Sequence, residues 1–212
     1  MELEKNSKTR KLLQNLLKLE DKVVGRPFPS MKRVRQISSY HCGPAVISEL
    51  FSYLGKDISQ SAVVKSLRAT NKIKSVGLNI HDLARATNAL GRQEVTFWRK
   101  HKSTANDLSL AVNKYKYPVG VEWQGVFYED EDEDNGHYAV ITKINKEANY
   151  LRMCDTYADF SGVDRRFRIN DFARRWWDVN RIKGRNIIDK KTMFVITPRD
   201  ETWPKKLGMV KI

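Results

Sequence analysis

Cys42 is the residue whose position in this chain most favours covalent chemistry. It lies in the segment Gln36-Ile37-Ser38-Ser39-Tyr40-His41-Cys42-Gly43-Pro44, and apolar residues then recur at positions 46, 47, 50, 51 and 54, the spacing of one helix face. Pro44 suits the first helical position and Gly55 suits the helix end, so we expect the helix to begin within about one residue of Cys42. Unpaired backbone N–H groups and a nearby base would then favour the nucleophilic thiolate.

His137 is the histidine best placed to act as that base. It opens the strand-like run Gly136–Ile144, which a turn at residues 145–149 joins to a second strand, Tyr150–Cys154, that ends at Asp155. With the turn centred on residue 146, His137 pairs directly with Asp155 and the two share one face. The same parity places Cys154 on the opposite face, which argues against Cys154 as the nucleophile.

The other three histidines have simpler interpretations. His41 is adjacent to Cys42 in the chain, and neighbouring side chains rarely point at each other, so we expect His41 in a loop or at a rim. His81 lies in an amphipathic helix that Asn79 would cap. His101 lies between two lysines in a surface charge cluster. For Cys42 itself, the alternative is a buried and inert thiol.

Taken together, these residues resemble the papain-like cysteine peptidases that process bacteriocins by cutting leader peptides after a double glycine, and their stand-alone relatives. Gln36 stands six positions before Cys42-Gly43, as in the family pattern. The further matches follow in the family's order over roughly residues 30–180: Asp57–Leu67, Gly77–Leu83, Ala89–Gly91, Tyr117–Val121, Gly136–Tyr138, Asp155 and Phe172–Trp176.

The resemblance implies an α+β, papain-like fold, with a helical half that carries Cys42, an antiparallel sheet half that carries His137 and Asp155, and a cleft between them. Its implied activity is hydrolysis of peptide bonds through a Cys-His-Asp triad and a covalent acyl-enzyme, with Gln36 helping to bind the developing oxyanion. An acyl or peptidyl transferase, or a deamidase, would use the same triad. This chemistry requires no cofactor and no metal, and two cysteines without a ligand cluster argue against zinc.

The sequence departs from the family in ways that bear on the substrate. His41 stands where the family often has an acidic residue or Asn, and Thr156 stands where a proline is common. The chain has neither an apolar run of about 18 residues nor a Gly-x-x-x-x-Gly-Lys loop, so we expect a stand-alone peptidase without a transmembrane segment.

Length and composition set the remaining expectations. The 212 residues suffice for one domain with a substantial core. We expect an amphipathic helix within residues 1–26, with a stripe of leucines that packs on a catalytic domain of residues 27–212; docking to a membrane surface or a partner is the alternative. The absence of a secretory signal and of a disulfide framework favours the cytoplasm.

The net charge of +14 suggests an acidic partner. Cations and aromatic residues alternate through residues 165–168 and 174–177 and on to Arg185, which would suit a basic nucleic-acid-binding module. We favour instead a solvated helix face with tryptophans in the core, and keep nucleic-acid binding as the non-enzymatic alternative.

The acidic run Glu129–Asp134 precedes His137 directly. It does not fit a calcium loop, because Asn135 and Ile141 stand where Gly and Glu are needed. A solvated loop is the simplest interpretation. The sharper hypothesis is that the run overhangs the cleft, attracts the basic segments of a peptide or protein substrate and raises the pKa of His137.

Overall fold

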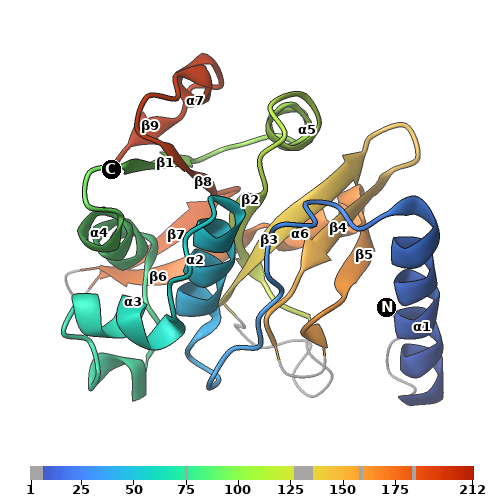
Figure 1. Cartoon of the computed structure of the whole chain (residues 1–212), viewed down its shortest axis with the longest axis horizontal. Helices are drawn as coiled ribbons and strands as arrows, with labels where there is room; N and C mark the ends of the chain where they lie inside the picture. The colour runs from blue at the N-terminus through green and yellow to red at the C-terminus, as the bar shows by residue number, and fades with distance from the viewer. Residues whose placement is uncertain (1–6, 75, 127–135, 158–159, 183–184) are drawn as a thin grey trace.

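The structure is a computed structural model that describes residues 7–74, 76–126, 136–157, 160–182 and 185–212. A seven-stranded antiparallel sheet forms its centre, with strand order β5-β4-β3-β2-β8-β1-β9 (Figure 1). The strands are β1 (Val95–Lys100), β2 (Val119–Gln124), β3 (Gly136–Asn145), β4 (Tyr150–Cys154), β5 (Asp164–Arg168), β8 (Met193–Pro198) and β9 (Val210–Lys211). A separate hairpin pairs β6 (Trp177–Ile182) with β7 (Arg185–Lys190).

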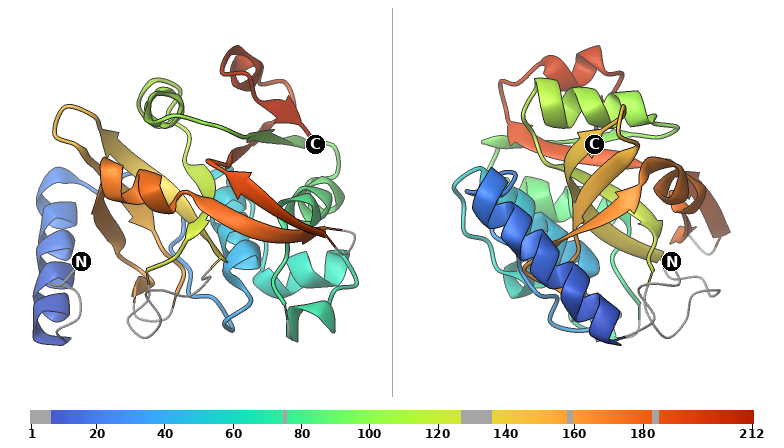
Figure 2. Two further views of the ribbon diagram at one scale, coloured as in Figure 1. Left: turned by 180° about the vertical axis from the view of Figure 1, so that it is seen from behind. Right: turned by 90° about the vertical axis from the view of Figure 1, so that its right-hand side faces the viewer.

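Helices cover both faces of the sheet (Figure 2). One face carries α2 (Cys42–Tyr53), α3 (Gln60–Ser66), the short η2 (Lys72–Lys74) and α4 (Ile80–Gly91). The other carries α5 (Ala105–Ser109), the π-helical η3 (Leu110–Lys114), α6 (Ile169–Arg175) and α7 (Trp203–Lys206). The expected α+β organisation is therefore confirmed, with additional short helices behind the sheet.

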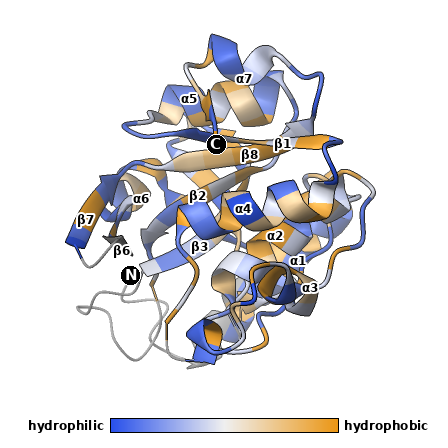
Figure 3. Cartoon of the chain, turned by 90° about the vertical axis from the view of Figure 1, so that its left-hand side faces the viewer, coloured by the Kyte–Doolittle hydropathy of each residue, from blue (hydrophilic) through white to orange (hydrophobic). Residues whose placement is uncertain are grey.

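The alternation of side chains along each strand supplies both hydrophobic cores. On β3, Tyr138 and Val140 pack toward α2, whereas Ala139 and Ile141 pack toward the opposite face. Strand β8 lies inside the sheet, between β2 and β1, which suits the apolar run Met193–Ile196, and Figure 3 shows the hydrophobic colour along this strand. A strand covered on both faces has no polar side to present, so its sequence does not alternate.

Helix α2 is the most deeply buried helix of the described chain. Its residues from Cys42 to Ser52 are all buried, and it packs against β3 and α4. The helix begins at Cys42, as expected, but Pro44 is its third residue and not its first. Proline is tolerated there because the first four N–H groups of a helix have no intrahelical acceptor. Gly55 follows the C-cap Leu54 with φ of +74°, a left-handed conformation that glycine adopts without strain.

The β3–β4 hairpin forms as predicted, but its predicted register is wrong by two residues. Cys154 opposes Val140, and a bulge between Ile141 and Lys143 adds Thr142 to β3. Without this extra residue, the register near the turn would place Asp155 opposite Val140 and on the α2 face. The bulge places Asp155 on the same face of the sheet as His137. The prediction that the two residues share a face is therefore correct, but the prediction that they are direct cross-strand partners is wrong.

Buried polar groups hold the bulge in place. The Thr142 hydroxyl donates to Asp164 Oδ2 at 2.6 Å, and the Arg33 guanidinium contacts both oxygens of the same carboxylate at 3.1 Å. Arg33 also donates to the carbonyls of Pro27, Phe28 and Met31, which fixes the segment that enters the domain. The Asp164 carboxylate of β5 therefore connects the bulge at Thr142 to the loop that contains Arg33.

Helix α1 (Ser7–Val24) lies along the β5 edge of the sheet (Figures 1 and 2). Its contacts include ion pairs of Glu20 and Asp21 with Arg152, whose guanidinium is buried. The expectation that the leucine stripe packs on the domain is wrong for Leu12, Leu16, Leu19 and Val23, which are exposed. The buried guanidinium of Arg152 requires a counter-charge, so Glu20 and Asp21 face the sheet instead of the leucines.

Replacing Thr142 by Val should destabilise the fold by about 1–3 kcal/mol, because Asp164 loses a buried hydrogen bond. The free energy of unfolding can be measured by urea titration. Thr87→Val is the matched control: within the described chain Thr87 is equally buried and its hydroxyl has no hydrogen-bond partner, so the change should be neutral or stabilising. Equal effects at the two positions would contradict the role assigned to Thr142.

Candidate active site

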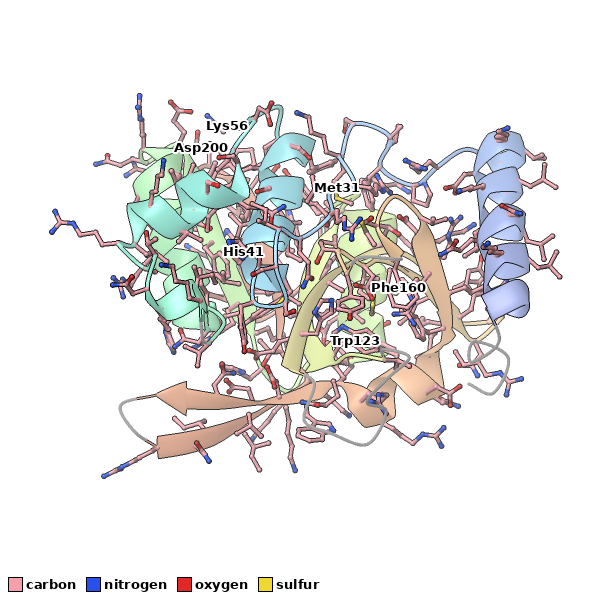
Figure 4. The ribbon with its side chains drawn as sticks, turned by 90° about the horizontal axis from the view of Figure 1, so that it is seen from below. Met31, His41, Lys56, Trp123, Phe160 and Asp200 are labelled. Carbon is pink, nitrogen blue, oxygen red and sulfur yellow. The ribbon has the colours of Figure 1, made fainter. Side chains whose placement is uncertain are left out.

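Cys42 lies at the N-terminal end of α2, the position that Figure 4 marks by the adjacent His41. Only 8% of Cys42 is exposed, but it lines a cleft of about 520 Å³. The helix start leaves the N–H groups of Cys42 and Gly43 without intrahelical acceptors, so this end of α2 favours negative charge. The sulfur is therefore buried enough to exclude most water and still open to the cleft.

His137 and Asp155 form a buried pair behind the sulfur. His137 Nε2 lies 2.9 Å from Asp155 Oδ1, and the two side chains are 3% and 0% exposed. This contact was predicted from the hairpin, and it is present in the structure. His137 also opposes Trp123 of β2, a fully buried side chain, so apolar contacts and a carboxylate together fix the ring.

The pair has strongly shifted protonation equilibria. Burial lowers the pKa of His137, but the charge and hydrogen bond of Asp155, together with contacts from Cys42, outweigh it and raise the pKa to about 10. Burial raises the pKa of Asp155, but His137 and Arg165 outweigh it and hold the pKa well below its usual range. The ring is therefore cationic and the carboxylate anionic at neutral pH.

Cys42 contacts the same imidazole. It contributes both a hydrogen bond and an electrostatic interaction to His137. Because Nε2 bonds to Asp155, Nδ1 is the ring nitrogen available to the sulfur. The structure therefore brings together Cys42, His137 and Asp155 from α2, β3 and the end of β4.

Arg165 is a member of the site that sequence reasoning missed. Its Nη1 donates to Asp155 Oδ2 at 2.8 Å and to the Val126 carbonyl at 3.1 Å. Its guanidinium stacks 3.5 Å from the centroid of the Phe160 ring, and the residue is 5% exposed. A sequence signal existed, because Arg165 lies on the strand after Asp155, but the surrounding basic residues suggested a surface cluster instead.

Gln36 is held close to Asp155 by hydrogen bonds to Thr156, the next residue in the chain. Its backbone N–H donates to the Thr156 carbonyl at 2.8 Å, and its side-chain oxygen accepts from the Thr156 hydroxyl at 3.0 Å. The amide nitrogen donates one of its two hydrogens to the Ser38 carbonyl at 2.9 Å. Thr156 therefore anchors the loop that leads to Cys42.

The cleft lies between the two halves of the structure, as expected. One wall comes from α2, η2 and the loop before α4, and the other from β3 and the β6–β7 hairpin. The residues that line it are Cys42, Lys72, Val76, Gly77, Leu78, Asn79, Gly136, Tyr138, Asp178, Val179 and Asn180. Gly136 allows close approach of the hairpin, since a Cβ there would lie 2.4 Å from Asp178 Oδ1.

A buried carboxyl group supports the second wall. Glu122 Oε1 accepts from the Tyr138 hydroxyl at 2.7 Å and from Asn180 Nδ2 at 2.8 Å. Burial raises its pKa to about 7, although both hydrogen bonds oppose the shift. Glu122 thus joins β2, β3 and the β6–β7 hairpin beneath the cleft.

The remaining histidines bond elsewhere. His41 Nδ1 contacts the Ser38 hydroxyl at 2.7 Å, His81 Nε2 lies 3.3 Å from an Arg99 nitrogen, and His101 Nδ1 lies 2.9 Å from the Thr192 hydroxyl. Asn79 caps α4, as predicted, and also forms a capping box with Asp82. Cys154 is fully buried and contacts Glu49 Oε1 at 3.1 Å on the α2 face.

The cations and aromatic residues of the C-terminal region are divided between the interior and the surface of the protein. Arg165 and Trp176 are buried, Arg175 donates to the carbonyls of Gln124 and Gly125, and Arg174 pairs with Asp171. This division argues against the nucleic-acid-binding alternative, because Arg165 and Trp176 are not at the surface and Arg175 is bonded to backbone carbonyls.

Within the described ranges, no group of three or more His, Cys, Asp and Glu residues is arranged to hold a metal ion. None of the helices in the same ranges has the length and apolar content to cross a bilayer. The acidic run Glu129–Asp134 lies outside the described residues.

Comparisons with known proteins identify the same architecture. A sequence profile of the Peptidase_C39 like family matches residues 28–183. Among solved structures, the peptidase domain of Streptococcus ComA, a bi-functional ABC transporter involved in a quorum sensing pathway, aligns with a TM-score of 0.54 and 19% identity over 79% of this chain and 98% of that domain. The predicted papain-like fold is therefore confirmed. A search of curated proteins gave no significant match.

The buried pair predicts a specific pH dependence of stability. Because the folded-state pKa of His137 lies above its ordinary value of 6.5 and that of Asp155 lies below its ordinary value of 3.8, the pair should stabilise the fold fully between pH 3.8 and 6.5. The contribution of His137 is then lost as the pH rises through about 10. His137→Gln should therefore lower the free energy of unfolding by a few kcal/mol near pH 6.5, and the loss should shrink toward pH 10.

Urea titrations across this pH range measure the difference, with His81→Gln on the surface of α4 as the matched control. A deficit of His137→Gln that stays constant with pH would contradict the proton-linked pair.

Proposed function

The chain belongs to the Peptidase_C39 like family and is a cysteine peptidase, and we propose that Cys42, His137 and Asp155 are its catalytic triad. The observation that carries the proposal is the contact of one imidazole with both the carboxylate of Asp155 and the sulfur of Cys42 at the mouth of a cleft. The three side chains come from separate elements, and their charges are complementary.

Acyl transfer follows from this geometry. The Cys42 thiolate attacks the carbonyl carbon of a peptide bond, forming a C–S bond, and the π electrons move to the carbonyl oxygen. His137 then donates a proton to the leaving nitrogen as the C–N bond breaks, which releases the amine and leaves a thioester. Neutral His137 takes a proton from water, the hydroxide adds to the thioester, and the thiolate leaves with the C–S electrons.

Gln36 and the N-terminus of α2 would stabilise the oxyanion. The bond to Ser38 uses one hydrogen of the Gln36 amide, and the second can donate to a substrate oxygen together with the Cys42 N–H. Both donors are fixed before the substrate arrives, Gln36 by Thr156 and the N–H by the helix. Such preorganised donors act mainly on the transition state.

Arg165 is a positioning residue in this proposal. By donating to Asp155 Oδ2, it leaves Oδ1 for His137 and supplies a second positive charge that keeps the carboxylate ionised. Its contact with Phe160 excludes water from the far side of the guanidinium.

The proposed substrate is a peptide or protein. In this proposal, residues 27–212 form the catalytic domain and the amphipathic helix lies within residues 1–26. Cleavage after a double glycine, attraction of basic segments by the acidic run and location in the cytoplasm stay predictions. A peptide library with and without double-glycine sites, analysed by mass spectrometry, separates hydrolysis from transfer by whether water or an added amine ends up on the acyl product.

Alkylation by iodoacetamide tests the nucleophile directly. Near neutral pH the wild type should be labelled at Cys42 and not at the buried Cys154, and the Cys42→Ala variant should be neither labelled nor active. His137→Ala should slow the labelling by about tenfold or more, because the neighbouring cation is lost. Labelling that is as fast in His137→Ala as in the wild type, or peptide hydrolysis by Cys42→Ala, would refute the triad.

The oxyanion role of Gln36 predicts a selective kinetic defect. Gln36→Glu keeps the size of the side chain but removes the amide donor, so kcat should fall by about 10²–10³-fold while KM changes little. Gln93→Glu, the same change on the surface, should leave both constants unchanged. An unaltered kcat in Gln36→Glu would remove Gln36 from the mechanism.

A further inference from the structure

Helix α1 turns an apolar stripe away from the protein. Leu12, Leu16, Leu19 and Val23 are spaced by four, three and four residues and therefore share one face of the helix. Their exposed fractions are 59, 53, 56 and 76%, among the largest of the exposed apolar side chains. Burying such side chains normally drives a surface helix onto its core, so an outward stripe suggests a second binding partner.

The orientation of the helix is fixed by its acidic side. Asp21 Oδ1 accepts from Arg152 at 2.7 Å and Asp21 Oδ2 accepts from Arg26 at 3.2 Å. Glu20 lies 3.5 Å from Arg152 and 3.6 Å from Lys143. Since Arg152 is 1% exposed, rotating the stripe inward would leave a buried guanidinium without its counter-charge.

A row of lysines borders the stripe on its other side. Lys11, Lys18 and Lys22 are exposed, and each directly precedes a stripe residue, which places all three about 100° around the helix in the same direction. Glu20 follows Leu19 and lies on the opposite flank, toward the sheet. The exposed face of α1 is therefore apolar and basic.

We propose that α1 is a membrane-surface helix that binds an anionic lipid bilayer. In this arrangement the stripe enters the boundary between headgroups and acyl chains, and the lysine row contacts acidic headgroups. The charge favours this occupant over a second copy of the chain, because two copies would each bring a net charge of +14 and a lysine row to the same interface.

The geometry of the helix suits a position flat on the surface. Its 18 residues span about 27 Å at 1.5 Å per residue, with the stripe running along most of that length. No residue of α1 lines the cleft, so the bilayer would hold the enzyme without closing its site. The proposal does not depend on the catalytic triad.

Vesicle co-sedimentation of the 212-residue chain tests the proposal. At physiological ionic strength the wild type should bind phosphatidylcholine vesicles that contain phosphatidylglycerol about tenfold or more tightly than pure phosphatidylcholine vesicles. Leu16→Glu should weaken binding by about tenfold or more, whereas Val210→Glu, a matched change at a similarly exposed residue on β9, should stay within about twofold of the wild type.

The role of the lysine row is tested by comparing its loss with the loss of three lysines elsewhere on the surface. K11Q/K18Q/K22Q should lose about 100-fold in affinity for the anionic vesicles, and the control K205Q/K206Q/K211Q much less. Thermal unfolding of each variant verifies the fold. Equal binding to neutral vesicles, full binding by Leu16→Glu, no vesicle binding by the wild type, or a dimer in sedimentation velocity that Leu16→Glu dissociates would each overturn the proposal.

Discussion

The ion pair between His137 and Asp155 is formed where neither group can reach bulk water, and this constraint organises the rest of the structure. Each buried ion costs several kcal/mol unless it is paired and hydrogen-bonded. The carboxylate of Asp155 is stabilised by His137, Arg165 and the Tyr157 N–H. The imidazolium of His137 is stabilised by Asp155 and Cys42. The elements that supply these partners, α2, β3, β4 and β5, must therefore assemble together for any of the groups to be stable.

Much of this arrangement follows from the sequence because its signals are local. The apolar spacing after Cys42 predicts where α2 begins. A β-branched and aromatic run, a polar turn and a second short run predict the hairpin that brings His137 to Asp155. The register was not predictable, because the bulge at Thr142 is held by Asp164 and Arg33, which lie far away in the chain. The shared face was correct because the error was two residues, and only an odd shift reverses the faces.

Other errors have the same origin in long-range pairing. The basic residues around Arg165 in the sequence suggest a surface cluster, but Arg165 is buried because it forms an ion pair with Asp155. The leucine stripe of α1 predicts an apolar contact with the domain, but the buried guanidinium of Arg152 selects Glu20 and Asp21 in its place. In both cases one buried charge outweighs the local pattern, because leaving it unpaired costs more than exposing an apolar side chain.

The protonation state of His137 is therefore the most direct test of the account. NMR of ¹⁵N-labelled imidazole groups across a pH titration of the wild type reports whether each ring nitrogen carries a proton. Because Asp155 and Cys42 raise the pKa of His137, we expect both ring nitrogens to stay protonated through neutral pH and to titrate near pH 10. A His137 ring that loses its proton near pH 6.5, the ordinary value, would contradict the buried ion pair.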